Sequence, residues 1–201
     1  MVTLRIPRLF GAVLAAGVLL GMPLATRAEE PTTVRFDAVF ATGGEVVNDA
    51  MSLAVWALDD DAPQQGKVAE RHAAPAEVAL APGRYRIEAI YDNLRRVQDI
   101  QVGSDSYQRV RINLRAGELA LNLLPRVGEQ PIKSPLAWDV RRYTGNGKPG
   151  QRVAAKTHKS LDLLLSEGWY KVAVAHNGKT VEHLVEVDAG RRYEYSLLLD
   201  E

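Results

Sequence analysis

LAPGRYRIEA, at residues 80–89, returns about 85 positions later as LSEGWYKVAV, at residues 165–174. Apolar and polar residues alternate after the glycine in the first stretch, and Tyr170, Val172 and Val174 keep the same two-residue spacing in the second, which is the pattern of a strand with one buried face. A similarity at a fixed period indicates that one structural unit is repeated along the chain. The sequence therefore predicts two copies of one β-rich domain.

The N-terminus has the three regions of a secretory signal peptide. Arg5 and Arg8 precede an apolar run at residues 9–20, and small residues end at Ala28. We expect residues 1–28 to be removed after Ala28 and the protein to be periplasmic or secreted. A retained membrane anchor is the alternative, although the run is shorter than the roughly 20 apolar residues that a membrane helix needs.

Composition excludes several classes of protein. The chain has 25 basic and 25 acidic residues, and removal of residues 1–28 takes away three arginines, leaving a formal charge of −3. This balance argues against binding to nucleic acid or to an anionic membrane. There is no cysteine, so the protein is not a lipoprotein and contains no disulfide.

Each copy contains seven short runs that alternate with a period of two. Such runs, separated by turn residues, favour an all-β fold of two tandem Ig-like antiparallel β-sandwich domains. The domains are predicted at residues 29–116 and 117–201, with no membrane span after cleavage. The predicted strands are residues 34–40, 51–58, 66–69, 76–80, 83–91, 95–102 and 108–114, then 118–124, 136–143, 152–156, 160–164, 168–176, 179–187 and 192–199.

The strongest local signal is a hairpin at Asn177-Gly178. Two residues of this kind form a type I′ turn, in which both central residues have positive φ. The turn predicts that Val172 faces His183 and Tyr170 faces Val185. The predicted register puts the apolar side chains on one face, where the alternation independently places them.

Metal binding is weighed on the four histidines and on one acidic run. The hairpin separates His176 from His183 by roughly 13 Å at a rise of about 3.3 Å per residue, which is too far for one metal ion. Asp59, Asp60 and Asp61 are consecutive, so they cannot all point at one calcium ion, and a solvated turn is expected. We therefore predict no cofactor and no metal. A periplasmic small-molecule or metal carrier remains the alternative function. The other two histidines are His72 and His158.

Catalytic signatures are missing from the sequence. There is no G-x-S-x-G motif and no cysteine nucleophile, and no carboxylate pair is marked as a glycosidase site. We predict that the protein is not an enzyme, with a hydrolytic enzyme as the third possibility.

The two copies differ on an outward-facing strand position. Arg84 occupies it in the first copy and Trp169 in the second, and tryptophan is enriched at binding hot spots. Leu184 and Leu198 have the same outward parity on strands expected to be neighbours. These three apolar residues, Trp169, Leu184 and Leu198, are the predicted partner interface, although single exposed apolar residues are also ordinary.

The copies also differ in the charge of one loop, whereas both have a tryptophan in the second strand. The acidic Asp59–Asp61 turn corresponds to a basic region in the second copy that includes Lys148 and Arg152, which suits a charged partner or solvated loops. Trp56 and Trp138 lie in the second strand of each copy, where a tryptophan commonly fills a sandwich core.

The phrase Leu-x-Pro-Gly-x-Tyr-x-Ile at residues 80–87 resembles the carboxypeptidase-regulatory-like and Ig-like accessory modules of exported bacterial proteins. The second copy has Glu167 in place of the proline and keeps Gly168 and Tyr170. The resemblance implies a spacer or interaction module without catalytic residues. The sequence thus favours a non-catalytic exported binding or scaffolding protein whose partner is another exported or envelope protein.

Overall fold

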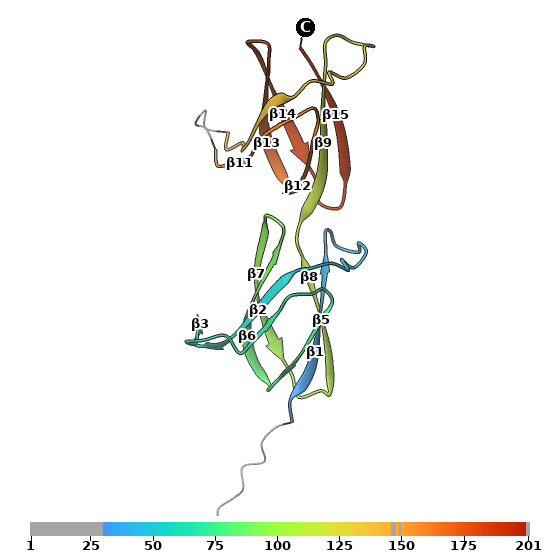
Figure 1. The fold of residues 1–201 in the computed structure, drawn as a ribbon. Coiled ribbons are helices and arrows are strands. Elements are labelled where there is room, and N and C mark those ends of the chain that lie inside the picture. The colour runs from blue at the N-terminus through green and yellow to red at the C-terminus, as the bar shows by residue number, and fades with distance from the viewer. Residues whose placement is uncertain (1–29, 146–147, 149, 200–201) are drawn as a thin grey trace, which may run out of the picture.

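The computed structural model describes residues 30–145, 148 and 150–199, and the predicted signal peptide lies outside this part of the chain. The described residues form strands and no helix (Figure 1). The strands are β1 (Thr32–Val39), β2 (Ser52–Asp59), β3 (Ala62–Pro63), β4 (Ala69–Arg71), β5 (Ala76–Leu80), β6 (Gly83–Tyr91), β7 (Leu94–Val102), β8 (Tyr107–Asn113), β9 (Ala116–Leu124), β10 (Leu136–Arg142), β11 (Arg152–His158), β12 (Leu161–Ser166), β13 (Gly168–His176), β14 (Lys179–Val187) and β15 (Arg192–Leu198).

The same pair of sheets occurs twice. In the first half of the chain, β5-β1-β8 forms one sheet, and β3-β2-β6-β7 forms the other, with β4 also paired to β2. In the second half the sheets are β12-β9-β15 and β11-β10-β13-β14. The predicted all-β sandwich is confirmed, with one refinement: β1 pairs with β8, and β9 with β15, in parallel. Parallel pairing is possible because the intervening strands supply the long crossover that it needs.

Each pair of sheets encloses its own hydrophobic core. Val34, Phe36 and Ile87 belong to the first core, and Leu121, Tyr170 and Val172 belong to the second. The two halves lie end to end (Figure 1). Two cores agree with the expected repeat, and the exact boundary between residues 116 and 117 stays a prediction.

The second-half hairpin has the predicted register, and the first half has the same pairing one repeat earlier. Val172 is opposite His183 and Tyr170 is opposite Val185 in the second half, and Ile87 is opposite Gln98 in the first. Asn177 and Gly178 have φ values of 49° and 75°, as a type I′ turn requires. The turn alone therefore predicts the register of all nine residue pairs between β13 and β14.

The repeated Gly-x-Tyr phrase closes a turn in each half. The Tyr85 hydroxyl donates to the Ala81 carbonyl oxygen at 2.7 Å, and the Tyr170 hydroxyl donates to the Ser166 carbonyl oxygen at 2.6 Å. Both rings are buried, so each hydroxyl satisfies a backbone acceptor at the corner between two strands. This bond is the structural reason why tyrosine recurs there.

The two tryptophans of the second strands differ, and the core prediction is wrong for one of them. Trp138 is 2% exposed, and its indole Nε1 donates to the His158 carbonyl oxygen at 2.9 Å. Leu53 and Val55 point into the core, and Trp56 has the opposite parity. Its side chain is half-buried on the outer side of the sheet, opposite Arg86. The shift of 85 residues aligns Trp138 with Leu53, not with Trp56.

The junction between the halves is tied by backbone contacts. The Ala116 amide donates to the Phe40 carbonyl oxygen at 3.0 Å, and the Gly190 amide donates to the Ala116 carbonyl oxygen at 2.7 Å. Arg115 pairs with Glu167, which links the end of the first half to the second. These contacts limit bending at the short connection between β8 and β9.

Candidate protein-binding surface

An exposed apolar group lies on the outer face of the sheet β10-β13-β14. Trp169 on β13 and Leu184 on β14 are 47% and 49% exposed, and Tyr143 at the end of β10 is 41% exposed. The Tyr143 amide donates to the Trp169 carbonyl oxygen at 2.8 Å, so these two residues are direct cross-strand neighbours. Leu184 is opposite Lys171, one diagonal step from Trp169. We call Tyr143, Trp169 and Leu184 the apolar trio.

Strand alternation explains why these side chains point outward. Their neighbours Tyr170 and Val185 point into the core, so the intervening residues face solvent. Trp169 and Leu184 are both exposed on this face, and their assignment to a partner interface stays a prediction. Tyr143 was missed, although its parity with the outward Arg141 could have identified it.

Leu198 does not join the apolar trio. It lies on β15, in the sheet β12-β9-β15, opposite Leu124. The expectation that its strand neighbours β14 within one sheet is wrong, because the chain crosses to the other sheet after β14. An interface that includes Trp169 would have to wrap around the sandwich edge to reach Leu198.

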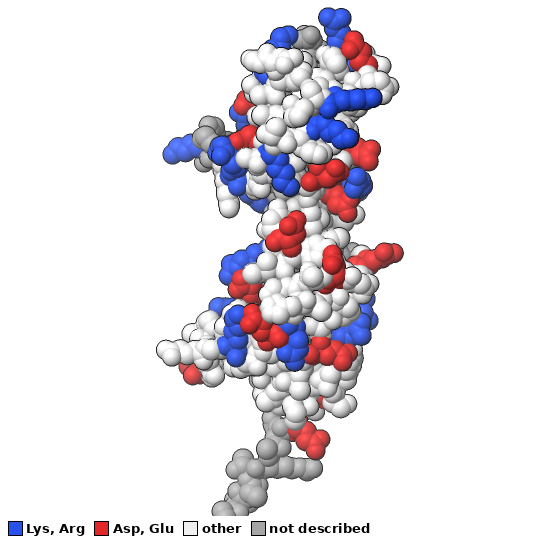
Figure 2. Space-filling view, viewed as in Figure 1, with Lys and Arg blue, Asp and Glu red and all other residues white. Residues whose placement is uncertain are grey.

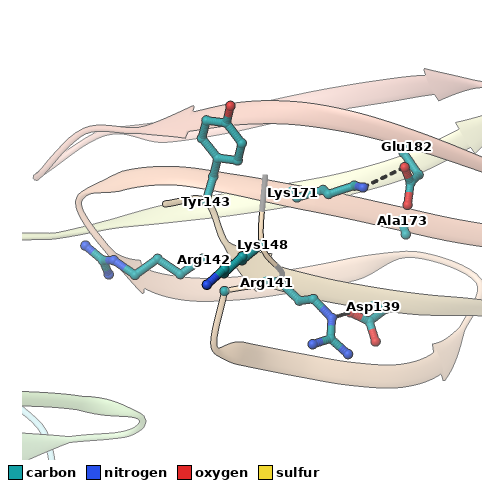
Figure 3. A pocket seen from close by; sticks show the side chains of 9 residues that line it. Asp139, Arg141, Arg142, Tyr143, Lys148, Lys171, Ala173 and Glu182 are labelled. Carbon is teal, nitrogen blue, oxygen red and sulfur yellow. Dashed lines mark hydrogen bonds and ion pairs between the residues drawn. The ribbon is translucent and has the colours of Figure 1, made fainter. Parts of the chain in front are cut away.

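A groove of about 550 Å³ lies beside the trio, and Tyr143 forms part of its wall (Figure 3). Its charged side chains pair with one another. Arg141 donates to Asp139 at 2.8 Å, and Lys171 pairs with Glu182 at 2.7 Å. These ion pairs form a polar rim of the kind that surrounds apolar interface centres.

The basic loop residues are placed next to this groove. Lys148 lines it and is exposed. Arg152, at the start of β11, pairs with Asp139 at 2.7 Å. The structure thus brings both predicted basic residues to the same side of the sheet as the apolar trio.

The first half has ion pairs at and beside the position equivalent to Trp169. Arg84, one repeat before Trp169, pairs with Asp61. Arg86 donates to Asp99 at 2.6 Å, and this hydrogen bond lowers the pKa of the Asp99 carboxyl. Basic and acidic side chains stand side by side over the visible face of both halves (Figure 2).

The predicted acidic turn is the tip of a hairpin. Asp59 ends β2, and Asp60 and Asp61 have positive φ values of 44° and 69° between β2 and β3. All three residues are exposed. Two short strands, β3 and β4, both pair with β2 and replace the single predicted strand at residues 66–69.

His176 and His183 lie apart on the second-half hairpin, as the predicted register requires. His176 is opposite Lys179 at the turn, and His183 is opposite Val172. Within the described residues there is no group of three or more histidine, aspartate or glutamate side chains that could hold a metal ion. The described part of the chain also has no helix long and apolar enough to cross a membrane.

No protein-family model matches this chain, and no curated protein matches it in sequence. Solved structures do. The TIE protein of Bacillus anthracis is 10% identical over 85% of this chain, with a TM-score of 0.33. The streptococcal ancillary pilin is 13% identical over 85%, with a TM-score of 0.32. A candidate adhesin from Bacteroides ovatus is 10% identical, with a TM-score of 0.44, over 84% of this chain and 87% of that one.

This chain spans 34% of the TIE protein and 62% of the ancillary pilin. At these identities and TM-scores, the likeness carries no argument about activity. Function must therefore be inferred from the surface of the molecule itself.

Proposed function

We propose that this protein is a non-catalytic exported binding or scaffolding protein that holds another exported or envelope protein through the apolar trio. The observation that supports this is an aromatic pair with an adjacent leucine, exposed on a flat sheet face and bordered by paired charges. Interface centres are enriched in tryptophan and tyrosine and are surrounded by polar residues that exclude water.

The sheet suits a rigid docking platform. Trp169 and Tyr143 are held by a backbone hydrogen bond between neighbouring strands, so little main-chain freedom is lost on binding. The residues behind them, Tyr170 and Val172, are at most 1% exposed. A partner would thus meet preorganised side chains.

Export is part of the proposal. The signal-peptide pattern at residues 1–28 supports a periplasmic or secreted location, and the absence of cysteine rules out a lipid-modified cysteine. The partner would therefore be met outside the cytoplasm.

The test compares Trp169→Ala with Arg84→Ala, the matched position in the first half. Purified wild-type protein is used to capture partners from an envelope extract, and the dissociation constant of each purified partner is then measured for both variants. Trp169→Ala should weaken binding about 30-fold, equivalent to a hot spot of about 2 kcal/mol, and Arg84→Ala should leave it within about twofold. Equal binding by wild type and Trp169→Ala would refute the assignment.

A further inference from the structure

The outer edge of β14 is unpaired along its whole length. Within the described part of the chain, β14 pairs with β13 and with no other strand. Its register runs unbroken from Lys179 to Val187, and the strand contains no proline. A long, regular edge is a template on which another extended segment can pair.

The hairpin turn determines which backbone groups point outward. In a two-residue hairpin the residues that flank the turn, His176 and Lys179, exchange both backbone hydrogen bonds, and bonded pairs then alternate along the strands. The N–H and C=O groups of the intervening residues therefore point away from β13. They belong to Thr180, Glu182, Leu184 and Glu186, and no described residue donates to or accepts from them.

The far side of β13 supports this alternation independently. The Trp169 carbonyl oxygen accepts from Tyr143 of β10, so Trp169 does not bond to its β14 neighbour Glu186. The backbone of Glu186 accordingly points to the open edge.

Four other edge strands of the four-stranded and five-stranded sheets are less suitable for pairing. β3 and β4 have two and three residues. β11 has a register irregularity opposite Val140 and Arg141, which bends an edge strand. β7 is as long as β14, but it lies against β12 of the second half. Among these edges, β14 alone is long, regular and unobstructed by the other half.

The side chains beside the edge specify a partner. On the outer face, Leu184 is flanked along the strand by Glu182 and Glu186, and all three are exposed. A strand paired with this edge places an apolar side chain opposite Leu184 and basic side chains opposite the two glutamates, because opposite charges stabilise cross-strand pairs.

We propose that the β14 edge accepts an extended segment of the partner protein as a fifth strand, with the outward pattern basic-x-apolar-x-basic. This inference rests on the proposed function and names the mode of binding. Main-chain hydrogen bonds supply affinity in such strand addition, and alternate side chains supply specificity. The added strand lies next to Leu184 and so extends the apolar trio.

The first test uses a synthetic peptide, acetylated and amidated, with Lys-Val-Leu-Val-Lys at its centre and threonine at both ends. Binding to the full mature chain is measured by fluorescence anisotropy, and amide exchange is followed by NMR. The peptide should slow exchange at Thr180, Glu182, Leu184 and Glu186 at least tenfold. A peptide with glutamate in place of both lysines should bind at least tenfold more weakly.

Two substitutions at one position separate the backbone from the side chain. Glu182→Pro removes an outward N–H but no hydrogen bond to β13, so a proline is tolerated at this edge position. Glu182→Ala keeps the N–H and loses the same carboxylate. Glu182→Pro should bind the peptide at least tenfold more weakly than Glu182→Ala. The matched control Val97→Pro, at the equivalent position of β7, should bind as wild type does.

A charge swap keeps the inference testable if the proline variant is unfolded. Glu182→Lys combined with Glu186→Lys should lose the lysine peptide and gain the glutamate peptide. Equal binding by Glu182→Pro and Glu182→Ala, or no protection of the four amides, would overturn the edge assignment. If Trp169→Ala still loses the captured partner in that case, the proposed function stands and only its mode is wrong; if neither substitution affects that partner, both fail.

Discussion

Removal of the Tyr170 hydroxyl tests whether the repeated Gly-x-Tyr phrase stabilises the fold. In Tyr170→Phe the ring keeps its place among the buried residues, and the hydrogen bond to the Ser166 carbonyl oxygen, 2.6 Å long, is lost. The Arg142 guanidinium, which donates to the same hydroxyl at 3.3 Å, loses an acceptor. A buried hydrogen bond contributes about 0.5–1.5 kcal/mol net, and an acceptor left without its donor costs more.

We expect Tyr170→Phe to lower the free energy of unfolding by about 1.5 kcal/mol, and Tyr85→Phe, which breaks one bond, by about 1 kcal/mol. The two sites lie in separate cores, so their effects should add. Urea unfolding followed by tryptophan fluorescence measures both, and the midpoint should fall without a change in slope.

The control is Tyr143→Phe, because the Tyr143 ring is exposed on the outer face. Its effect should stay within about 0.5 kcal/mol, as is usual for surface substitutions. If Tyr170→Phe is no less stable than Tyr143→Phe, the hydroxyl does not stabilise the corner and our explanation of the repeated tyrosine is wrong.

Three further substitutions test the junction, a buried ion pair and a turn. A Cβ at Gly117 would collide with the Asp188 carbonyl oxygen, so Gly117→Ala should cost about 2–3 kcal/mol of unfolding free energy in urea; a cost under about 0.5 kcal/mol would contradict the packing at the junction. Burial raises the pKa of Asp37. The hydrogen bonds and positive charges of Arg109 and Arg35 lower this pKa by more, so that it lies below its ordinary value of 3.8. Wild type should therefore lose its advantage over Asp37→Asn as the pH falls below about 3.8, and a constant difference between pH 7 and pH 2 would contradict this. Gly178 has a φ of 75° and open space around its Cβ position, so Gly178→Ala should cost only about 1–2 kcal/mol, from backbone conformation alone.

The strands and hairpin registers were predictable because they depend on local chemistry. The Asn177-Gly178 turn and the alternation on either side give the same pairing, and the structure has it. Local agreement of turn and pattern is what makes a strand assignment dependable.

One prediction failed because it depended on which sheet a strand joins, and another because residue type was given more weight than parity. Leu198 has the outward parity expected of it, but β15 pairs with β9 in the opposite sheet. Trp56 was assigned to the core by its residue type, although its parity relative to Leu53 and Val55 places it outside. Parity is a local property, whereas sheet membership is set by the path of the whole chain, which one sequence does not reveal.

The repeat also bears on where a function can arise in this fold. Inward positions such as Tyr85 and Tyr170 recur because each half needs the same corner and the same buried volume. No such requirement applies to outward positions. The same arrangement of strands therefore has Arg84 paired with Asp61 in the first half and an exposed Trp169 in the second. An ion pair at the surface contributes little to stability, and an exposed tryptophan leaves apolar area in contact with water. The second half therefore leaves exposed an apolar surface that a partner could bury, whereas the first half presents paired charges at the equivalent position. Binding through the second half and spacing by the first would follow from this difference.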